Sequence, residues 1–567
     1  MKHFSGDISI VLGGAAGQGV QTVEELLVNV LKREKYNVFA CKEYMSRIRG
    51  GSNSTEIRVT DKKRAAFVNR IDFLFALDKD VLPHLKHRIS SKTVVLGEKN
   101  KIVDTQELHV IDVPFTRFAH ELGNPLYTST VAVGVALGLL KADVVIFQEY
   151  LRTHFARKGD DIIKKNLEAA EKGYVFGKHL AYSEGIEVVM KKNETVKNEL
   201  LLDGHEAVGL GALAGGCDYI SSYPMTPGTG VLTFLAQKGR ALGVIVDQAE
   251  DEIAAINQGL GAGYAGARAL VTTSGGGFDL MTEGVSLAGM IETPIVIHIA
   301  GRPGPSTGLP TRTEQADLNL ALYAGHGEFP RAIFAPGTLA EAFSVMVQAF
   351  HIAHAYQIPV FILTDQYFVD ALTTVAEEDF PFIAWQQHIV KTDALYKRYA
   401  VTENGVSPRG IPGYGEGLVG VDSDEHDDEA HITESAVVRV AMHEKRLRKI
   451  SGIRDEAFLP TEFGDVKRAD TIVVSWGSNR GVLEEALEHL LRDDVAGVHF
   501  SQVYPLPKAA KKIFTRKEII VIENNASGQF AELLQQEYGV KVKKRILQYD
   551  GSPFSVEEII ERVKILL

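Results

Sequence analysis

Residues 247–278 read DQAEDEIAAINQGLGAGYAGARALVTTSGGGF, and this stretch is the most informative part of the chain. It predicts a helix that begins at Glu252 and has an almost bare surface, because small residues recur along it: Ala254, Ala255, Gly259, Gly261 and Ala262. Each glycine destabilises a helix by about 1 kcal/mol relative to alanine, so we expect these small residues to have a structural or functional role. Either the helix packs tightly on a sheet, with Glu252 at its N-terminal dipole, or a flat ligand approaches it.

Composition and charge exclude several classes of protein. The 567 residues carry a net charge of −12, which gives no basic footprint for nucleic acid or for an anionic membrane surface. No apolar run reaches the roughly 18 residues of a membrane span, and the first residues do not have the layout of a signal peptide. We therefore expect a cytoplasmic protein without nucleic-acid or membrane partners, and the length predicts about three or four domains.

The cysteine content restricts redox chemistry. Cys41 and Cys217 are the only cysteines, and no C-x-x-C pair occurs. This excludes a disulfide framework, and it excludes a four-thiolate iron–sulfur cluster held by this chain alone. We predict no metal-ligating residues here, so any cluster must lie on another polypeptide.

Strand, glycine turn and helix alternate along the chain. Residues 7–12 (DISIVL) form an apolar run, a glycine-rich turn follows at 13–19, and residues 20–36 have a helical pattern. A second unit begins near Leu202 with six apolar strands separated by helices, which is typical of a parallel sheet covered on both faces. The sequence therefore predicts the α/β class.

Two later segments differ from this pattern. Residues 395–435 are rich in glycine, proline and acid, and a loop this long in a compact enzyme is either functional or disordered. A third α/β unit opens with DTIVVSWGSNRGVLEEALEHLL at Asp470. Asn524 and Asn525 follow one of its strands, where asparagine is most often a turn former.

The helix at Glu252 resembles the pyrimidine-domain helix of thiamine-diphosphate enzymes. Alanines stand two and three residues after this acid, and a glycine stands nine residues after it. In that superfamily the matching glutamate bonds to the aminopyrimidine of the cofactor, and the resemblance implies that Glu252 is the catalytic acid. Glu250 also has a glycine nine residues on but lacks the alanine pair, so Glu252 is the preferred assignment.

Two further motifs resemble those of the 2-oxoacid:ferredoxin oxidoreductases. Residues 222–229 (SYPMTPGT) look like the Y-P-I-T-P loop, and residues 302–311 (RPGPSTGLPT) look like the substrate-arginine segment. An arginine fork can hold the carboxylate of a 2-oxoacid, with threonine hydroxyls as directional donors. The resemblance implies substrate contacts from Thr226, Arg302 and Thr311, and thiamine contacts from Tyr223, Pro224, Ser274 and Gly275. The alternative is a proline-rich turn and a surface arginine.

The sequence departs from the family pattern at one place. Residues 273–277 read TSGGG where the family has T-S-G-P-G, so Gly276 replaces a proline. The substitution makes the loop looser but removes no chemical group.

The N-terminal glycine turn resembles that of a gamma-type domain of the same family. Residues 13–19 (GGAAGQG) and 46–51 (SRIRGG) carry this likeness. Backbone N–H groups at such a turn attract an anion. The resemblance implies coenzyme A contacts from Gly17, Gly19, Arg47 and Arg49, whereas structural turns with solvated arginines are the alternative.

The resemblance covers nearly the whole chain. It implies three α/β domains with parallel or mixed sheets and a connecting segment: a gamma-type domain at 1–190, a pyrimidine-binding domain at 197–385, the connection at 386–455 and a transketolase C-terminal-like domain at 456–567. The G-D-G…N segment that binds the diphosphate and Mg²⁺ is missing from the sequence, as are cluster cysteines. In split members both belong to a beta-type subunit.

The implied activity is oxidative decarboxylation of a 2-oxoacid to acyl-CoA and CO2, with electrons passed to ferredoxin. The implied partners are a beta-type subunit with Mg²⁺ and a [4Fe-4S] cluster, in an (alpha-beta)2 assembly, and ferredoxin. Residues 326–330 (HGEFP) look most like 2-oxoglutarate members, with pyruvate and branched-chain oxoacids as alternatives. The competing hypothesis is a non-catalytic subunit that binds coenzyme A or a nucleotide.

Overall fold

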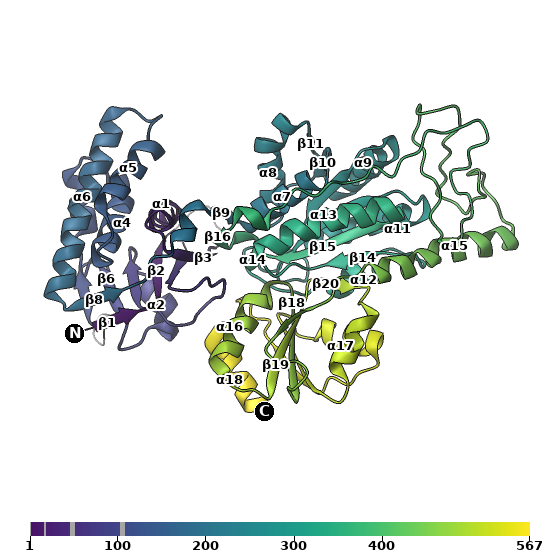
Figure 1. Cartoon of the computed structure of the whole chain (residues 1–567). Helices are drawn as coiled ribbons and strands as arrows, with labels where there is room; N and C mark the ends of the chain where they lie inside the picture. Colours follow the sequence, from purple (N-terminus) through teal and green to yellow (C-terminus); the bar gives the residue numbers. More distant parts are fainter. Residues whose placement is uncertain (1, 16–18, 46–50, 103–107) are drawn as a thin grey trace. The chain divides into compact units, whose positions relative to one another are not determined.

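The computed structural model describes residues 2–15, 19–45, 51–102 and 108–567. The chain forms two compact units (Figure 1): Met1–Leu202 with Asp370–Asp379, and Asp203–Val369 with Phe380–Leu567. The chain therefore passes from one unit to the other and back before it completes the second. We describe each unit by itself.

The first unit contains an eight-stranded mixed sheet. Its order is β7-β6-β5-β2-β4-β3-β16-β9, with bounds Val110–Asp112, Val94–Gly97, Phe73–Ala76, Asp7–Ala15, Ser52–Thr60, Asn37–Glu43, Leu372–Val375 and Leu200–Asp203. Strand β2 pairs with β5 in parallel and with β4 antiparallel. A separate parallel pair joins β1 (Lys2–Ser5) to β8 (Ile186–Val189). Strand β16 begins at Leu372, 169 positions after β9 ends at Asp203, and it pairs antiparallel with β3.

Helices of the first unit pack through glycines. Helix α1 (Val20–Arg33) follows the glycine turn, and α4 (Thr128–Leu139) lies against α6 (Asp160–Ser183). A Cβ on Gly134 would lie 2.6 Å from the carbonyl oxygen of Ala170, so only glycine permits this backbone approach. The remaining helices of this unit are α2 (Val81–Leu85), α3 (Phe115–Glu121) and α5 (Val144–His154).

The second unit is built on a seven-stranded sheet. Its order is β11-β10-β12-β13-β15-β14-β20, with bounds Ile245–Gln248, Tyr219–Ser222, Ala269–Thr273, Ile295–Gly301, Pro359–Asp365, Ala332–Phe334 and Gln502–Tyr504. Only β20 is antiparallel to its neighbour; the other pairs are parallel. Such strands are buried on both faces, which explains their continuous apolar runs.

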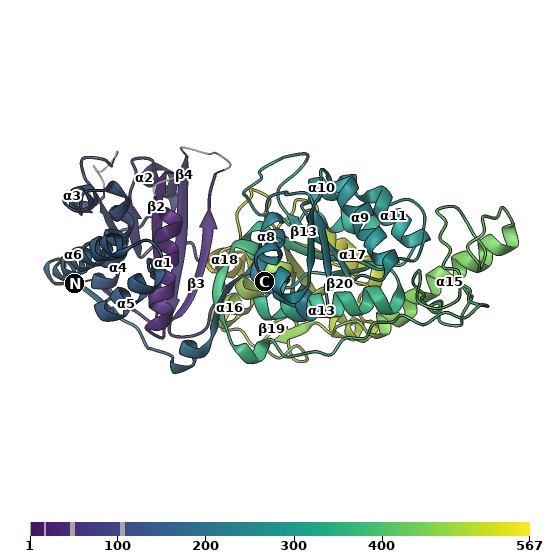
Figure 2. The same cartoon turned by 90° about the horizontal axis from the view of Figure 1, so that it is seen from above.

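Helices cover both faces of this sheet. Figure 2 shows α13 (Leu339–Tyr356) on one side and α9 (Glu252–Ala265), α10 (Gly275–Leu280) and α11 (Thr282–Met290) on the other. Helices α7 (Gly204–Ala214), which packs on α13, α8 (Thr229–Lys238), α12 (Leu318–Tyr323) and α14 (Gln366–Asp370) complete the layers. The carboxyl ends of β10, β12 and β13 lead into the loops that contain the predicted site residues.

A five-stranded sheet follows in the same unit. Its order is β17-β19-β18-β21-β22, with bounds Thr461–Phe463, Val495–Phe500, Thr471–Trp476, Glu518–Glu523 and Lys544–Leu547. Its helices are α16 (Arg480–Leu490), α17 (Gln529–Tyr538) and α18 (Val556–Leu566). The predicted α/β class with parallel and mixed sheets is confirmed.

Residues 380–435 are mostly irregular, yet they are packed onto the second unit. They lead into α15 (Ala436–Asp455), which extends beneath them in Figure 1. The Tyr399 side chain is fully buried, and Arg398 donates to the Glu292 carbonyl at 2.7 Å. The segment is therefore held in place by buried side chains and is not disordered, and its function stays untested.

A buried ionic cluster secures α15. The Glu292 carboxylate lies 2.6 Å from Lys445 Nζ and 2.5 Å from Lys449 Nζ, and all three side chains are buried. Burial alone would raise the pKa of Glu292, but Lys449, Lys445 and Arg398 hold it well below its usual range. The carboxylate is therefore ionised at neutral pH and binds two lysines of one helix turn.

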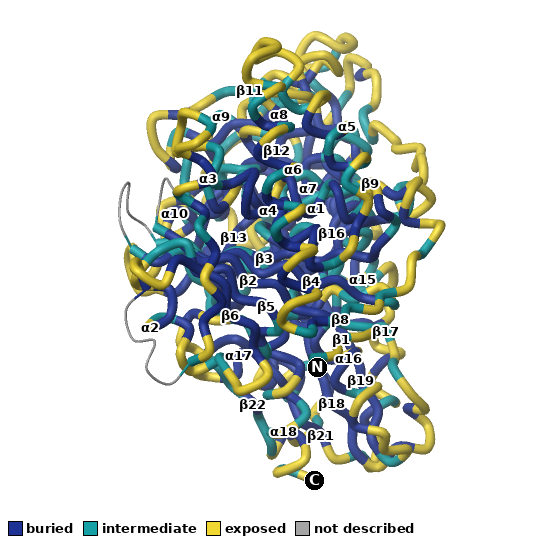
Figure 3. Tube along the Cα trace, turned by 90° about the vertical axis from the view of Figure 1, so that its left-hand side faces the viewer, coloured by how far each residue is buried: buried dark blue, intermediate teal, exposed yellow. Residues whose placement is uncertain are grey.

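The buried residues are concentrated in the sheets. Figure 3 shows the central strands of the sheets dark blue and many outer loops yellow, so the cores lie between sheet and helices. Among the described helices, none is both long and apolar enough to cross a membrane.

Candidate active site

Glu252 is the first residue of α9 and is buried. The preceding Asp251 caps the helix and accepts from the Ala254 backbone N–H at 2.8 Å. The Glu252 side chain is only 3% exposed, and its Oε1 is a buried atom without a hydrogen-bond partner among the described residues. Glu250, the alternative acid, is exposed. The structure thus places the preferred acid, and not its neighbour, inside the molecule.

The environment of Glu252 favours its protonated form. Burial raises its pKa, and the nearby Asp251 raises it further, whereas a backbone hydrogen bond and Arg302 act in the opposite direction. A carboxyl group shielded from water that keeps its proton can hold or release it to a bound group.

A glycine loop approaches this acid closely. A Cβ on Gly277 would lie 2.5 Å from Glu252 Oε1 and would also collide with Thr273 Oγ1. Gly275 is similarly restricted, since its Cβ would lie 2.5 Å from the carboxyl carbon of Asp317. Gly276, the position that departs from the family pattern, is exposed and has one neighbour at 3.3 Å. The loop therefore needs its outer glycines more than its middle one.

The glycines of α9 have different surroundings. Gly259 packs against Ile295 and Val271, where a Cβ would be 3.0 and 3.1 Å away, and Gly263 meets the Pro294 carbonyl. These two glycines fit the tight-packing alternative. Gly261, nine residues after Glu252, faces open space.

Arg302 joins the Thr226 loop. Its Nη1 donates to the Thr226 carbonyl oxygen at 2.7 Å, and its Nε is buried without a partner among the described residues. Burial lowers the pKa of Arg302, while Asp317 and Glu252 raise it. The structure brings Thr226 and Arg302 together, and Arg302 is only 9% exposed.

The other predicted residues of this region surround the same strand ends. Thr311 is buried in the segment between β13 and α12. Tyr223 is exposed, Pro224 is half-buried, and Ser274 and Gly275 are buried at the start of α10.

Five buried polar atoms without partners gather in these residues. Among the described residues, they are Glu252 Oε1, Thr273 Oγ1, Ser274 Oγ, Arg302 Nε and Asp317 Oδ2. Buried polar atoms are normally hydrogen-bonded, so such a group indicates a missing polar ligand. The residues present fit an aminopyrimidine and a carboxylate, which offer both donors and acceptors.

Asp317 was not predicted from the sequence. Burial raises its pKa to about 7, with Glu314 and Asp279 adding to the effect and Arg302 opposing it. Its carboxylate faces Gly275 and Gly301. From the sequence, an aspartate just before a short helix is interpreted as a helix N-cap, so no local signal identifies Asp317 as a site residue.

In the first unit, a cavity of about 390 Å³ lies at the start of α1. Gly19 is on its wall and has a φ of 79°, which favours glycine. The other lining residues include Gln21, Thr22, Lys42, Tyr44 and Asn53. Gly17, Arg47 and Arg49 lie outside the described residues.

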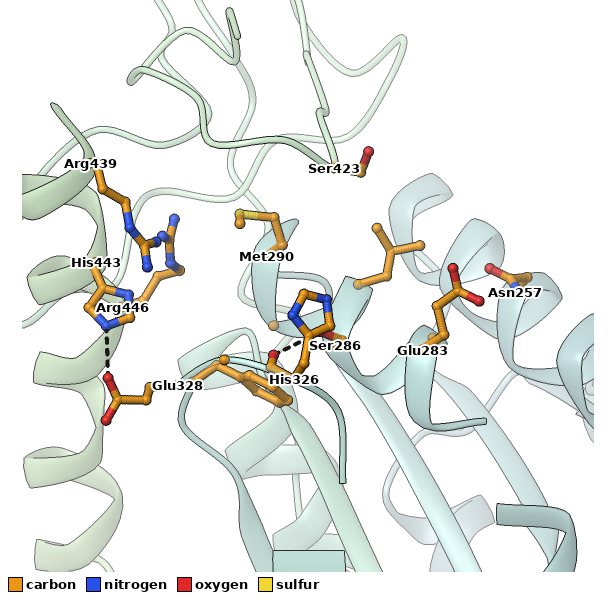
Figure 4. A pocket seen from close by; sticks show the side chains of 15 residues that line it. Asn257, Glu283, Ser286, Met290, His326, Glu328, Ser423, Arg439, His443 and Arg446 are labelled. Atoms are coloured by element: carbon orange, nitrogen blue, oxygen red, sulfur yellow. Dashed lines mark hydrogen bonds and ion pairs between the residues drawn. The ribbon is translucent and has the colours of Figure 1, made fainter. Parts of the chain in front are cut away.

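A larger cavity of about 530 Å³ lies apart from Glu252 and Arg302. Figure 4 shows His326 and Met290 between Glu283 of α11 and the basic side chains of α15. His443 Nε2 is 3.4 Å from Glu328, so the 326–330 segment contacts α15 here. The cavity wall includes His326, Glu328 and Phe329 of the 326–330 segment, although no motif in the sequence predicted a cavity there.

Family comparisons agree with the two halves of this description. Residues 210–445 match the family described as "Pyruvate flavodoxin/ferredoxin oxidoreductase, thiamine diP-bdg", which includes Glu252 and both loops. Residues 9–176 match "Pyruvate ferredoxin/flavodoxin oxidoreductase". The second unit is therefore of the thiamine-diphosphate-binding class.

Relatives that match most of the chain are also found. The 2-oxoacid:ferredoxin oxidoreductase subunit alpha of Sulfolobus sp is 31% identical over 98% of this chain and 96% of its own. The 2-oxoglutarate oxidoreductase subunit KorA of Mycobacterium tuberculosis is 31% identical over 75% of this chain and 66% of its own.

One solved structure matches nearly the whole chain. It is the 2-oxoglutarate:ferredoxin oxidoreductase from Magnetococcus marinus with 2-oxoglutarate, coenzyme A and succinyl-CoA bound, with a TM-score of 0.92, 30% identity and 99% of each chain covered. This chain belongs to the 2-oxoacid:ferredoxin oxidoreductases, as an alpha subunit.

Proposed function

We propose that this subunit supplies the pyrimidine-side and carboxylate-side contacts for oxidative decarboxylation of 2-oxoglutarate. In that reaction the oxoacid and coenzyme A give succinyl-CoA and CO2, and two electrons pass singly to ferredoxin. The observation that carries the proposal is Glu252, a buried acid with an unpartnered oxygen beside the glycine loop. The relative with 2-oxoglutarate and succinyl-CoA bound supports this choice of substrate.

Each residue has a defined task in this proposal. Thiamine diphosphate, when bound, supplies the carbon nucleophile and the electron sink. Glu252 is placed to exchange a proton with the aminopyrimidine, and burial raises the pKa of its carboxyl. Arg302 pairs with the oxoacid carboxylate, and Thr226 and Thr311 orient it. Tyr223, Pro224, Ser274 and Gly275 line the cofactor side.

A beta-type partner completes the site in this proposal. The two cysteines, Cys41 and Cys217, are buried, and burial raises the pKa of both thiols, which disfavours the thiolate form that ligates iron. The partner therefore supplies the cluster, the Mg²⁺ site and the diphosphate contacts, in an (alpha-beta)2 complex. The cavity beside Gly19, together with Gly17, Arg47 and Arg49, is assigned to coenzyme A.

The decisive experiment compares Glu252→Gln with Glu250→Gln in the complex purified with its partner. Loss of the proton-holding group should lower the turnover of 2-oxoglutarate about 10²–10⁴-fold in the first variant only. Wild-type turnover by Glu252→Gln, or an equal loss in Glu250→Gln, would show that the acid is misassigned.

The division of labour has its own test. The isolated chain with thiamine diphosphate, Mg²⁺, coenzyme A and 2-oxoglutarate should not reduce a viologen dye, because no cluster is present. Adding the partner should protect the backbone amides of α9 and of the Thr226 loop from hydrogen exchange. Turnover by the pure chain would refute the assignment, as it would favour a self-sufficient enzyme. A complex that binds coenzyme A but never decarboxylates would instead support a non-catalytic binding subunit.

A further inference from the structure

Three successive carbonyl groups of the Thr226 loop accept hydrogen bonds from three separate side chains. The Thr226 carbonyl accepts from Arg302 Nη1 at 2.7 Å, and the Pro227 carbonyl accepts from His205 Nε2 at 2.9 Å. The Gly228 carbonyl accepts from Thr272 Oγ1 at 3.1 Å. These donors lie after β13, on α7 and on β12, so the loop backbone is held by the surrounding scaffold.

The hydrogen bond from Thr272 to the Gly228 carbonyl is the last in a series of side-chain hydrogen bonds. Thr272 Oγ1 is 2.8 Å from His298 Nδ1, and His298 Nε2 is 2.8 Å from Thr364 Oγ1. All three side chains are buried, with His298 fully so. In the sheet register Thr272 pairs with His298, and Thr364 pairs with Ala300, two residues after His298. The hydrogen-bonded side chains therefore cross β12, β13 and β15 on one face of the sheet.

The donor and the acceptor in each of these hydrogen bonds follow from the number of hydrogens that each group carries. A carbonyl can only accept, so the single hydroxyl hydrogen of Thr272 is used on Gly228. Thr272 must then accept from an N–H at His298 Nδ1. Burial lowers the pKa of His298 to about 3, so its ring is neutral and its Nε2 accepts from the Thr364 hydroxyl. His298 is therefore fixed as the Nδ1–H tautomer.

The presence of these three buried polar side chains inside the sheet calls for an explanation. Apolar residues fill most of the other positions of these strands, and an apolar trio would pack there without any hydrogen bonds to satisfy. The series of hydrogen bonds instead ends on a carbonyl two residues after Thr226, whose own carbonyl is bound by Arg302.

We propose that Thr364, His298 and Thr272 form a relay that positions the Thr226 loop, and with it Arg302, for the oxoacid carboxylate. They are positioning residues, since they act through the loop and do not touch the substrate. The proposal rests on the function proposed above for Thr226 and Arg302. It goes beyond that function because it assigns substrate alignment to three residues inside the sheet.

The kinetic test uses Thr272→Val, which keeps the shape and removes the hydroxyl, in the complex with its partner. We expect the KM for 2-oxoglutarate to rise about tenfold, as for a lost hydrogen bond that leaves a buried group unsatisfied, while the KM for coenzyme A is unchanged. Thr272→Ser should restore the wild-type value. The control is Thr293→Val, because Thr293 is also buried but precedes β13 at its opposite end.

The outcomes separate the relay from the function on which it rests. If Thr226→Val raises the KM for the oxoacid but Thr272→Val does not, the relay is wrong and the function stands. If neither variant changes that KM, the assignment of Thr226 to the carboxylate fails. Equal effects of Thr272→Val and Thr293→Val would show a general packing defect and would also overturn the relay.

A spectroscopic test needs no partner and no turnover. The ring nitrogens of His298 can be read in ¹⁵N spectra of histidine-labelled protein and assigned by their loss in His298→Asn. We expect the neutral Nδ1–H tautomer throughout the range from pH 5 to pH 8. A protonated ring or the Nε2–H tautomer would overturn the proposed direction of the relay.

Discussion

Glu292 and Lys449 form a 2.5 Å ion pair in which both side chains are 1% exposed, although 156 positions separate them in the chain. Lys445, one turn earlier on the same helix, contacts the other carboxylate oxygen at 2.6 Å. Since one carboxylate faces two lysines, its loss would leave two buried cations without a counter-ion.

Glu292→Gln should therefore strongly destabilise the second unit. Breaking a buried ion pair by removing one partner typically costs about 3–5 kcal/mol. The measurement is the unfolding midpoint in urea at pH 7, with Asp494→Asn as the control, because Asp494 pairs with Arg492 at the surface. An equal midpoint for Glu292→Gln and wild type would mean that the cluster adds no stability.

The same carboxylate predicts a dependence on pH. The pKa of Glu292 is lowered in the folded state, so its stabilisation is fully present above about pH 4.5 and is lost as pH falls toward the folded value. The slope of stability against pH below 4.5 should therefore be smaller in Glu292→Gln than in wild type. Identical slopes would argue against an ionised Glu292.

Asp317 predicts a pH dependence of stability that is opposite in sign to that of Glu292. Its pKa is raised from 3.8 to about 7, so the folded state holds a proton that the unfolded state has already released. Stability from this group is present below pH 3.8 and is lost as pH rises through 7. Asp317→Asn should gain stability relative to wild type as pH rises from 5 to 8, measured by thermal unfolding. The control is Asp493→Asn, at an exposed position of the same unit.

Arg302→Lys should impair use of the oxoacid. A lysine ammonium cannot form the fork that binds a carboxylate and the Thr226 carbonyl together. Loss of a charge-assisted contact costs about 1.5–3 kcal/mol, or roughly ten- to a hundredfold in kcat/KM. Steady-state kinetics of the complex measure this, with Arg240→Lys at an exposed site as the control. Unchanged kinetics with every oxoacid would place the carboxylate elsewhere.

Gly277→Ala should disturb Glu252 more than Gly276→Ala. The added Cβ at 277 would lie 2.5 Å from Glu252 Oε1, whereas at 276 the nearest atom is 3.3 Å away. Overpacking of this kind costs about 1–3 kcal/mol of stability, so the unfolding midpoint of the first variant should fall. Because the displaced group is the Glu252 carboxyl, the activity per folded molecule should also fall in the first variant and not in the second. Equal activities would show that the loop moves freely away from Glu252.

Local patterns in the sequence predicted much of the fold. The apolar strands of the second unit and the bare helix from Glu252 were found because strand runs, small residues and glycine turns are local signals. The burial of Glu252 and the contact of Arg302 with the Thr226 loop agree with the residues singled out. These features depend on a few neighbouring positions.

Other features depend on pairs that are distant in sequence. His298 lies in an apolar strand and reads as a core residue, and its hydroxyl partners become visible only when β12, β13 and β15 are aligned. The Glu292 cluster likewise needs the packing of α15. Strand β16 has the sequence LTTV, and nothing local in it says which sheet it joins.

Strand β16 also limits how this polypeptide can be divided. It lies between β3 and β9 in the eight-stranded sheet, yet it is contributed by residues 372–375. A fragment cut after residue 202 would keep β9 but lose the strand that joins it to β3, exposing unpaired backbone on both. A genetic fission at that boundary would therefore yield a first piece prone to edge-to-edge association. Grafting residues 370–379 onto its end should be needed to obtain a monomeric module.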